Sequence, residues 1–497
     1  MLSCEDLPST PKPEIGKILI TGASGYVGGR LVHELIARGY QVRVMARTKT
    51  TAREERWPDA EIVVADALEF SDLKKALKGV HTAYYLIHSL LLGHGNLETK
   101  KIHEEDIQAA INFRIAAEEN HVKRIVYLGG LGGTRTSLSP HLKSGMQVAE
   151  ELEKGKVPVT RLYSAMIIGA GSAPYEILKH LAIDSPVLLI PRWARTKCQP
   201  ICIRDVIKYL IGVLEVDETS GKSFDICGKD LLSYEMMLKI FADLLGAKVF
   251  FIPSPVSSVT FFSYVTSLLT PVPMPITRSL MEGVVNEAIC GNDMIKQLVP
   301  IEQMSYIEAL QSAMSREERD AVYSSWSDEY PRAHELSLKL NELRSPPTFS
   351  ISYSLLTPKG AASLFQSICR IGGKEGWLKN NWMWWLRGLL DRMLMGVGSS
   401  RGRRSSNDLR INDVIDFWRV EDIKPNQRLL LRAEMMLPGR GWLEFSINRE
   451  DNANRLSVTA YHKTNTMWGR IYWHIFMPFH KIIFYDLIDR IEKRASD

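Results

Sequence analysis

The sequence predicts an α/β protein: a doubly wound parallel sheet with a small helical lobe, followed by an α+β domain. Two observations predict the first part. A glycine-rich turn follows the first apolar strand, and strands then alternate with helices as far as about residue 230. A third observation predicts the second part, because beyond residue 346 the strands follow one another directly and are separated by short turns.

The composition describes an ordinary globular protein of more than one domain. The chain has 497 residues, of which 45% are hydrophobic and 24% charged, and this length exceeds what one core usually holds. The net charge of +5 is small and the basic residues are spread along the chain, so nucleic acid is not an expected partner. We predict an N-terminal tail (1–14), a parallel-sheet domain (15–230), a substrate-side helical lobe with a linker (231–345) and an α+β domain (346–497).

We predict no metal site from the cysteines, no secretion signal at the N-terminus and no membrane span in the apolar segments. The six cysteines form no Cys-x-x-Cys pair, which favours reduced packing cysteines of an intracellular, cytoplasmic protein over a zinc site. The N-terminus lacks the basic flank and apolar run of a signal peptide. The apolar stretches 256–270 and 471–488 are too short or too polar to cross a bilayer. Peripheral contact with a membrane stays open because these stretches are rich in aromatic residues.

The turn that reads TGASGYVG (21–28) predicts a site for the pyrophosphate of a dinucleotide. Without Cβ atoms, Gly22 and Gly25 let the backbone turn tightly and approach an anion, and Gly28 lets the next helix pack against the strand. The N-terminus of that helix then presents its unpaired N–H groups to the phosphates. The alternative is a structural glycine loop that binds no ligand.

The end of the second strand indicates which dinucleotide is bound. A carboxylate there would bind the ribose 2′-hydroxyl of NAD, whereas a cation suits the 2′-phosphate of NADP. Arg47 occupies this place and no acid follows before Glu54, so we expect NADP, with NAD as the alternative. The competing interpretation makes Arg47 a solvated charge at a strand end. The residues predicted to bind the cofactor are Thr21, Gly22, Ser24, Gly25, Tyr26, Val27, Gly28, Arg47, Asp66 and Ala67.

These motifs resemble those of the extended and atypical short-chain dehydrogenase/reductase family over roughly residues 15–343. The matching marks are the glycine turn, Asp66, Asn112 and the pair Asp205 and Val206. Longer stretches, such as RIVYLGGLGG, IIGAGSAPYEIL and PRWARTKCQPICIRDV, are similar to a bacterial subgroup akin to NmrA-like regulators and the NADPH-binding accessory subunit of respiratory complex I. The resemblance implies a Rossmann-like fold and a nicotinamide cofactor.

The resemblance also locates the catalytic groups of the family, and this sequence lacks them. Family catalysis uses a serine, which would fall within residues 129–133, and a tyrosine and a lysine on the next helix. His141 occupies the tyrosine position and Gly145 the lysine position. His141 is the candidate acid or base because histidine titrates near neutral pH; the alternative is a surface or capping residue. The residues expected to line the substrate side of the nicotinamide, with packing as the alternative, are His88, Arg192, Trp193 and Gln199.

Beyond Pro346 and Pro347 the composition changes, since eight of the eleven tryptophans lie in this part. Strand-like segments between residues 413 and 463 predict an antiparallel meander, and a long aromatic helix is expected from about Trp468. Together with the preceding helices they suggest a helix-grip cavity of the START/polyketide-cyclase type. Residues 376–484 resemble a domain of unknown function that is often fused behind such dehydrogenase-like chains. Arg401, Arg403 and Arg404 suggest an anion or membrane contact, with a solvated turn as the alternative.

The sequence therefore supports three hypotheses about function. The first is an atypical NADP-dependent oxidoreductase that acts on an apolar small molecule, because nicotinamide chemistry belongs mostly to the cofactor. The second is a non-catalytic NAD(P)H-binding redox sensor or assembly protein, which fits the missing serine, tyrosine and lysine. The third, a carrier of an apolar ligand, rests on the C-terminal domain alone. No protein partner is identified.

Overall fold

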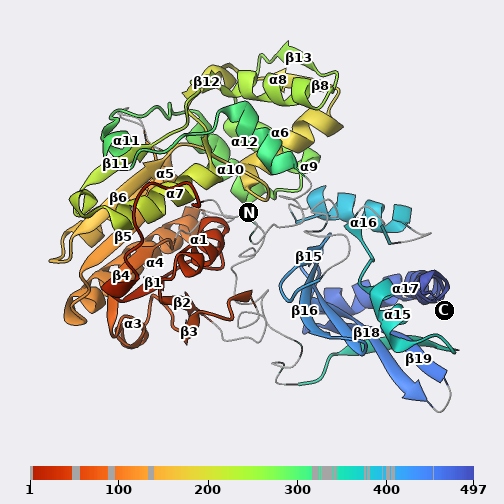
Figure 1. Cartoon of the computed structure of the whole chain (residues 1–497). Helices are drawn as coiled ribbons and strands as arrows, with labels where there is room; N and C mark the ends of the chain where they lie inside the picture. The colour runs from red at the N-terminus through yellow and green to blue at the C-terminus, as the bar shows by residue number, and fades with distance from the viewer. Residues whose placement is uncertain are drawn as a thin grey trace. The chain divides into compact units, whose positions relative to one another are not determined.

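The computed structural model describes residues 4–47, 56–87, 96–132, 139–315, 324, 326, 340, 343, 345–373, 376–377, 381–393, 396–398, 403, 409–450 and 453–496. The contacts within the chain define two compact units: residues 1–269 with 274–326, and residues 270–273 with 327–497. The first unit contains a parallel sheet and the second an antiparallel sheet (Figure 1).

A seven-stranded parallel sheet forms the centre of the first unit. Its strands lie in the order β11 (Ser223–Ile226), β6 (Val159–Ser164), β5 (Arg124–Gly130), β4 (Val80–Tyr85), β1 (Lys17–Ile20), β2 (Val42–Ala46) and β3 (Glu61–Val64). The chain moves outward from β1 to β3, returns to β4 beside β1, and then continues in the opposite direction to β11. This reversal defines a doubly wound, Rossmann-like sheet. The predicted fold class of the first part is confirmed.

Helices cover both faces of this sheet because its strands are apolar on both sides. The helices beside the sheet are α1 (Tyr26–Ala37), α3 (Phe70–Ala76), α4 (Asn96–Glu119), α5 (Pro140–Glu153) and α7 (Ile203–Glu215). Tyr84 and Tyr85, adjacent on β4, point to opposite faces. The Tyr84 hydroxyl donates to the Leu210 carbonyl of α7 at 2.8 Å, whereas the Tyr85 ring packs edge-on against Phe113 of α4. Helices α7 and α4 therefore lie on opposite faces.

The rest of the first unit is a helical lobe with three short two-stranded sheets. Its helices are α6 (Ala173–Asp184), α8 (Tyr234–Leu244), α9 (Val259–Leu269), α10 (Met274–Val284), α11 (Met294–Leu298) and α12 (Tyr306–Met314). The strand pairs are β7 (Ile167–Ile168) with β10 (Ile201–Cys202), β9 (Lys197–Cys198) with β12 (Leu232–Ser233), and β8 (Val187–Ile190) with β13 (Phe250–Pro253). The described residues of the unit also include the short 3-10 helices η1 (Pro13–Ile15), η2 (Arg192–Arg195) and η3 (Asp217–Thr219).

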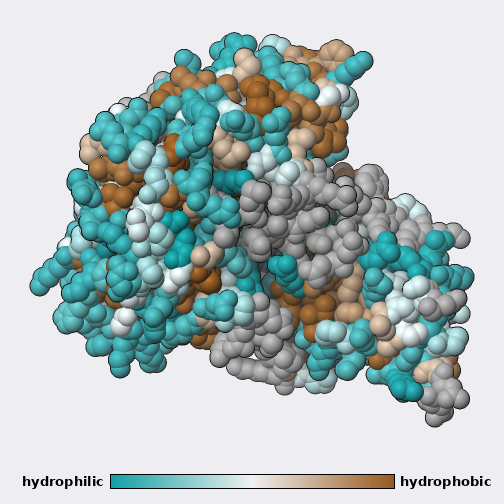
Figure 2. Space-filling model, in the orientation of Figure 1, coloured by the Kyte–Doolittle hydropathy of each residue, from teal (hydrophilic) through white to brown (hydrophobic). Residues whose placement is uncertain are grey.

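One face of the β8–β13 pair is an exposed apolar surface. Four alternating residues of the two strands have exposed side chains: Val187, Leu189, Phe250 and Ile252. Figure 2 shows brown, hydrophobic surface over this upper part of the unit, where Figure 1 labels β8, β13 and α8. The apolar character predicted for the lobe therefore extends to its surface.

Cys227 and Cys290 form a disulfide. This corrects the expectation that the cysteines are all reduced. Cys227 directly follows β11, and Cys290 follows α10, so the bond joins the two ends of the segment that carries α8, α9 and α10. The two positions are 63 residues apart in the chain, and no sequence pattern predicted this pairing. The free cysteines, all buried, are Cys4, Cys198, Cys202 and Cys369.

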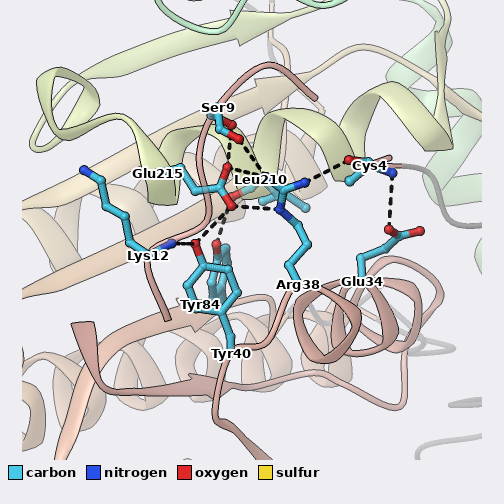
Figure 3. A network of polar contacts seen from close by, with 9 residues as sticks. All are labelled: Cys4, Ser9, Lys12, Glu34, Arg38, Tyr40, Tyr84, Leu210 and Glu215. Carbon is cyan, nitrogen blue, oxygen red and sulfur yellow. Dashed lines mark hydrogen bonds and ion pairs between the residues drawn. The ribbon is translucent and has the colours of Figure 1, made fainter. Parts of the chain in front are cut away.

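The N-terminal segment, predicted to be an extended tail, packs instead on the first unit (Figure 3). Glu215, at the end of α7, accepts hydrogen bonds from Arg38 Nε at 2.8 Å and Nη2 at 2.9 Å, and from the Tyr40 hydroxyl at 3.0 Å. The Ser9 hydroxyl donates to the same carboxylate. Arg38 also donates to the carbonyl oxygens of Cys4 and Ser9, both at 2.8 Å. One buried carboxylate and one guanidinium therefore hold the segment against α1 and α7.

The second unit is an antiparallel sheet with three described helices. Its strands lie in the order β14 (Phe349–Thr357), β19 (Ala453–Lys463), β18 (Arg440–Glu450), β17 (Arg428–Ala433), β16 (Trp418–Lys424) and β15 (Val414–Ile415). The helices are α15 (Ala361–Ile368), α16 (Asn381–Met393) and α17 (Met467–Arg494). The predicted meander corresponds to β16 to β19, and the predicted long helix to α17. Strand β14 adds a pairing beyond those predicted, because the first strand of the unit pairs with the last.

Helix α17 packs on the sheet through its C-terminal half. Leu487, Ile488 and Ile491 are buried in the core of the second unit, together with residues of α15 and of the sheet. The helix also contacts β14 and β19. Among the helices of the described residues, none is long and apolar enough to cross a membrane.

Candidate functional site

The glycine turn lies where the carboxyl ends of β1 and β4 meet. Gly22 has a φ of +65°, and a Cβ at this position would lie 2.5 Å from the Leu86 carbonyl oxygen, so a side chain does not fit. Thr21 Oγ1 donates to the Tyr84 carbonyl at 2.9 Å and accepts from the Leu86 N–H at 3.1 Å. A Cβ on Gly28 would lie 2.3 Å from the Gly22 carbonyl oxygen. The turn is therefore fixed to β4 and packed closely beneath α1.

Helix α1 begins directly after this turn. Gly25 is its N-cap with an extended backbone, and among the described residues no side chain caps the helix. Tyr26, Val27 and Gly28 form the first turn, and Ser24 lies in the preceding bend. The first N–H groups of a helix lack partners within the helix, and the helix dipole favours an anion beside them. The arrangement fits the phosphates of a dinucleotide.

Two further predicted residues follow β3 at the same edge of the sheet. Asp66 Oδ1 accepts the Leu68 N–H at 3.0 Å, so this carboxylate stabilises its own turn. Asn112 of α4 donates to the carbonyls of Ala67 at 3.3 Å and Leu68 at 2.9 Å. Asn112 therefore holds the turn beside α4, which gives a structural role to a residue noted for its family resemblance. Arg47 is exposed at the end of β2.

His141 lies in the first turn of α5, after the N-cap Ser139, whose hydroxyl accepts the Leu142 N–H at 3.3 Å. Burial lowers the pKa of His141 to about 4, because the interior disfavours the imidazolium. The ring is therefore neutral at physiological pH. This corrects the expectation that His141 titrates near neutrality, while its role in catalysis stays a prediction.

Gly145, at the lysine position of the family, makes a hydrogen bond through its backbone. The Gly145 carbonyl accepts a hydrogen bond from the Tyr127 hydroxyl of β5 at 2.8 Å. Burial raises the pKa of Tyr127, which makes this phenol a poor proton donor to a substrate. Tyr127 also packs edge-on against Tyr163. The space beside Gly145 therefore contains aromatic rings that support the sheet, and neither tyrosine replaces the missing lysine.

A polar pair between α4 and α5 was missed from the sequence. His103 Nδ1 and Ser144 Oγ are 2.8 Å apart, and Ser144 is buried. The two residues are 41 positions apart in the chain, and neither belongs to a motif that would identify the pair.

The predicted substrate-side residues do not share one role. His88 lies outside the described residues. Arg192 and Trp193 belong to η2, where Trp193 Nε1 donates to the Ser257 carbonyl at 3.2 Å and the indole packs edge-on against Phe262. Trp193 therefore joins η2 to α9 and the segment before it.

Gln199 belongs to the packing of the lobe. Its Oε1 accepts the Cys290 N–H at 2.8 Å, and its carbonyl accepts the Gly228 N–H at 3.3 Å. These contacts flank the disulfide and support the packing alternative over the predicted substrate contact. Arg403, in the second unit, likewise donates to the Ile371 carbonyl at 2.8 Å. Arg401 and Arg404 lie outside the described residues.

Asp205, a further mark of the family resemblance, is a buried carboxylate in the first turn of α7. Its Oδ2 accepts the Met304 N–H at 2.9 Å, and its Oδ1 has no hydrogen-bond partner among the described residues. Burial raises the pKa of Asp205 to about 6. Gln303 donates to the Tyr209 hydroxyl at 3.1 Å. Asp205 therefore fastens the segment before α12 to α7.

Residues 22–157, which contain the glycine turn and His141, match a family described as NAD(P)H-binding. These residues form an NAD(P)H-binding domain. Residues 348–487 match a family described as a protein of unknown function, DUF2867. The nucleotide-binding part of the resemblance is confirmed, whereas the helix-grip interpretation of the second unit stays a prediction.

Curated relatives match part of the chain at low identity. NADH dehydrogenase [ubiquinone] 1 alpha subcomplex subunit 9, mitochondrial, from Dictyostelium discoideum is 22% identical over 231 residues, which cover 45% of this chain and 62% of that protein. The 3-beta-hydroxysteroid dehydrogenase of Mycolicibacterium neoaurum is 28% identical over 122 residues, which cover 24% of this chain and 33% of that protein. The chain thus matches less than two thirds of the length of either relative.

Among solved structures, the Citrobacter sp. triphenylmethane reductase complexed with NADP(H) is similar in fold to part of the chain. It is 19% identical, covers 60% of this chain and 100% of its own, and has a TM-score of 0.49. The family match over residues 22–157 and the curated relatives show that the first unit contains an NAD(P)-binding, Rossmann-like domain with oxidoreductase relatives.

Proposed function

We propose that the chain is an atypical oxidoreductase that binds NADP(H) in its first unit and acts on an apolar small molecule. The observation that carries this proposal is the closed glycine turn beneath the N-terminus of α1, at the carboxyl edge of a doubly wound sheet. Dinucleotides bind at this edge in such sheets. Hydride transfer is chemistry that the nicotinamide itself supplies, so this chain needs to position the ring rather than to provide a full catalytic set.

Arg47 supports the preference for NADP. It is exposed at the end of β2, at the edge of the sheet where the adenosine half of a dinucleotide lies. A guanidinium can bind the 2′-phosphate through two parallel hydrogen bonds, whereas NAD carries no phosphate there. NAD is the alternative cofactor, and the calorimetric titration described below compares the two.

The apolar surface of the lobe supports an apolar substrate. Exposed side chains of β8 and β13 form one hydrophobic face, and α9, which reads VTFFSYVTSLL, carries the exposed Phe261. One relative is named for action on a 3-beta-hydroxysteroid, and a neutral polycyclic alcohol or ketone of this kind is the substrate class that we propose.

A second candidate function is a non-catalytic NAD(P)H sensor or assembly protein. The observation that favours it is the state of the three catalytic positions: His141 is half-buried and neutral, the Gly145 carbonyl accepts from the Tyr127 hydroxyl, and residues 129–132 are Gly, Gly, Leu and Gly. The relative named as a subunit of NADH dehydrogenase is consistent with an assembly role.

For the second unit we propose the helix-grip architecture. The pairing of β14 with β19 and the packing of the long C-terminal helix α17 on the sheet support it. The cytoplasmic location and peripheral membrane contact stay predictions.

Calorimetric titration of the full chain with NADPH and NADH tests cofactor binding. Gly22→Ala places a Cβ 2.5 Å from the Leu86 carbonyl oxygen and should abolish binding. Gly79→Ala is the matched control, because Gly79 also has a positive φ, at +72°, but its Cβ would meet nothing within 4 Å and it precedes β4 at the opposite edge. The control should keep the wild-type affinity. Unchanged NADPH affinity in a folded Gly22→Ala protein would remove the assigned site.

Turnover then separates the enzyme from the sensor. The oxidation of NADPH is followed by absorbance while steroid ketones and quinones are added to the wild-type protein. Saturable oxidation with one of them supports the oxidoreductase. Tight NADPH binding without oxidation by any of these acceptors supports the sensor instead.

A further inference from the structure

The second unit contains an apolar cavity of about 260 Å³. Its walls come from α16, α17, the strands β16, β18 and β19, and the segment that follows β17. Most of the lining side chains are aromatic or aliphatic, and five of them are tryptophans: Trp382, Trp384, Trp418, Trp442 and Trp473. Pockets for drug-sized ligands usually measure roughly 300–1,000 Å³. A cavity just below this range suits a small molecule of about two fused rings.

Several buried nitrogen atoms on the cavity-lining residues have no hydrogen-bond partner among the described residues. They are Nε1 of Trp384, Nε1 of Trp418, Nε2 of His462 and Nδ1 of His480. Trp384, Trp418 and His462 are each more than nine-tenths buried. Burying an indole N–H without an acceptor costs free energy, because the group can only donate and has lost its water.

Other buried tryptophans of the same unit do have hydrogen-bond acceptors for their indole N–H groups. Trp377 Nε1 donates to Asp416 Oδ2 at 2.7 Å, and Trp442 Nε1 donates to Glu421 Oε2 at 2.9 Å. Buried indoles in this unit thus receive acceptors from the protein where acceptors are within reach. At Trp384 and Trp418 the described residues supply none. Both nitrogens are closed to solvent in this structure, so a bound molecule provides the missing acceptor only if the two rings shift when it binds.

The charges around the cavity indicate a neutral ligand. Burial lowers the pKa of His462 and lowers that of His480 to about 4, so both rings are neutral at physiological pH. Arg387, the cation on the lining, donates to the Met436 carbonyl at 2.8 Å and lies 3.8 Å from the Asp391 carboxylate. Its charge is compensated within the protein, so the described lining residues leave no uncompensated cation for a carboxylate or phosphate.

The cavity has an apolar route to solvent between α16 and α17. Four of its apolar lining residues are exposed: Trp382 at 62%, Leu390 at 46%, Phe479 at 45% and Leu386 at 41%. Trp382 and Leu390 belong to α16 and Phe479 to α17. A hydrophobic molecule can therefore enter between the two helices past these exposed apolar side chains.

We propose that this cavity binds a neutral, flat and largely apolar molecule whose carbonyl or hydroxyl oxygen accepts hydrogen bonds from the indoles of Trp384 and Trp418. The ring of Trp384 stacks on Trp377 at 4.6 Å and on Phe417 at 5.7 Å between centroids, so the wall beside these donors is aromatic. The site lies entirely within the second unit and does not depend on the NADP(H)-binding function proposed for the first.

A pair of isosteric probes tests the proposal on the full chain. 2-Acetylnaphthalene carries a ketone oxygen, and 2-isopropenylnaphthalene has a CH₂ group in its place, so their shapes are nearly the same. Equilibrium dialysis should give the ketone roughly tenfold higher affinity, which corresponds to about one net hydrogen bond. Equal affinity for the two probes, or binding of neither, would overturn the proposal.

Three variants locate the site. Trp384→Phe with Trp418→Phe removes both indole N–H groups but keeps aromatic rings, and should cancel the advantage of the ketone while retaining the hydrocarbon. Trp382→Phe is the matched control at the exposed rim and should keep the tenfold difference. Ala460→Phe fills the cavity and should lower the affinity for both probes at least tenfold, with NADPH affinity unchanged. Undiminished probe binding in a folded Ala460→Phe protein would place the probes elsewhere and contradict the proposal.

Discussion

Replacing Glu215 by glutamine removes the charge at the centre of the network that holds the N-terminal segment. The side chain of Glu215 is fully buried, and that of its partner Arg38 is 12% exposed. Glutamine keeps the shape and one acceptor oxygen, but its NH₂ group must face donors on Arg38, Tyr40 or Ser9. The variant therefore leaves a buried guanidinium without a counter-charge and at least one donor without an acceptor.

The expected loss in the free energy of unfolding is about 3 kcal/mol. Removing one partner of a buried ion pair costs roughly 3–5 kcal/mol, because the other charge stays buried without compensation. The lower end applies because the remaining amide oxygen still accepts one hydrogen bond, and because burying the wild-type carboxylate already carries a desolvation penalty. The Lys12 N–H donates to the Tyr40 hydroxyl at 2.9 Å, so loss of the network also weakens the attachment of the segment.

Urea unfolding of the full chain at pH 7, followed by far-ultraviolet circular dichroism, measures this loss. Asp217→Asn is the matched control, because Asp217 pairs with Lys12 at 2.9 Å in the same region but is 83% exposed. Exposed pairs contribute roughly 0–1 kcal/mol, so this control should unfold almost like the wild type. If Glu215→Gln destabilises no more than Asp217→Asn, the network does not hold the segment and the argument from its burial is wrong.

Three further predictions concern the cofactor and the buried titratable groups. Arg47→Asp should weaken NADPH binding more than NADH binding, by roughly 1.5–3 kcal/mol from the lost charge-assisted bonds, and calorimetry showing equal weakening would mean that Arg47 does not contact the 2′-phosphate. His141→Ala should keep NADPH affinity, and the rate of NADPH oxidation by the wild type should show no titration between about pH 6 and 8, because the pKa of His141 is lowered to about 4. The stability of the wild type should be fully present above about pH 6.5 and fall toward pH 4, because the unfolded chain protonates this histidine first; urea unfolding along a pH series measures this loss, which His141→Ala should not show. Asp205→Asn should raise the free energy of unfolding at pH 7 by up to about 3 kcal/mol, because the raised pKa of about 6 makes the charged form of Asp205 costly in the folded state. The substitution should have little effect below about pH 4, so urea unfolding that shows the same stability difference at both pH values would contradict this explanation.

The first unit was predictable because its signals are local. The glycine turn, the apolar strand before it and the alternation of strands and helices lie within short segments, and each specifies one β-α unit. The same holds for the turns between β16, β17, β18 and β19. Local patterns identify elements and their order, and rules of connection then restrict the topology.

The features that were missed depend on contacts between distant parts of the chain. The neutral state of His141 follows from its burial, which no neighbouring residue in the sequence reveals. The partner of Cys227 is 63 positions away. The order of the N-terminal segment depends on Glu215, at the far end of α7. The cavity of the second unit arises from the packing of two helices on a sheet, and its unpaired indoles are recognisable only when every other donor has been assigned.

The bond between Cys227 and Cys290 makes the segment with α8, α9 and α10 a closed ring of covalent chain. A protease cut within this ring produces two fragments that stay joined on a non-reducing gel and separate on a reducing one. If the protein is pulled apart by its two ends, the ring carries no tension, because force passes from Cys227 to Cys290 through the sulfur atoms. Reduction would then release the segment between the two cysteines, which are 63 positions apart, and lengthen the stretched chain by roughly 200 Å.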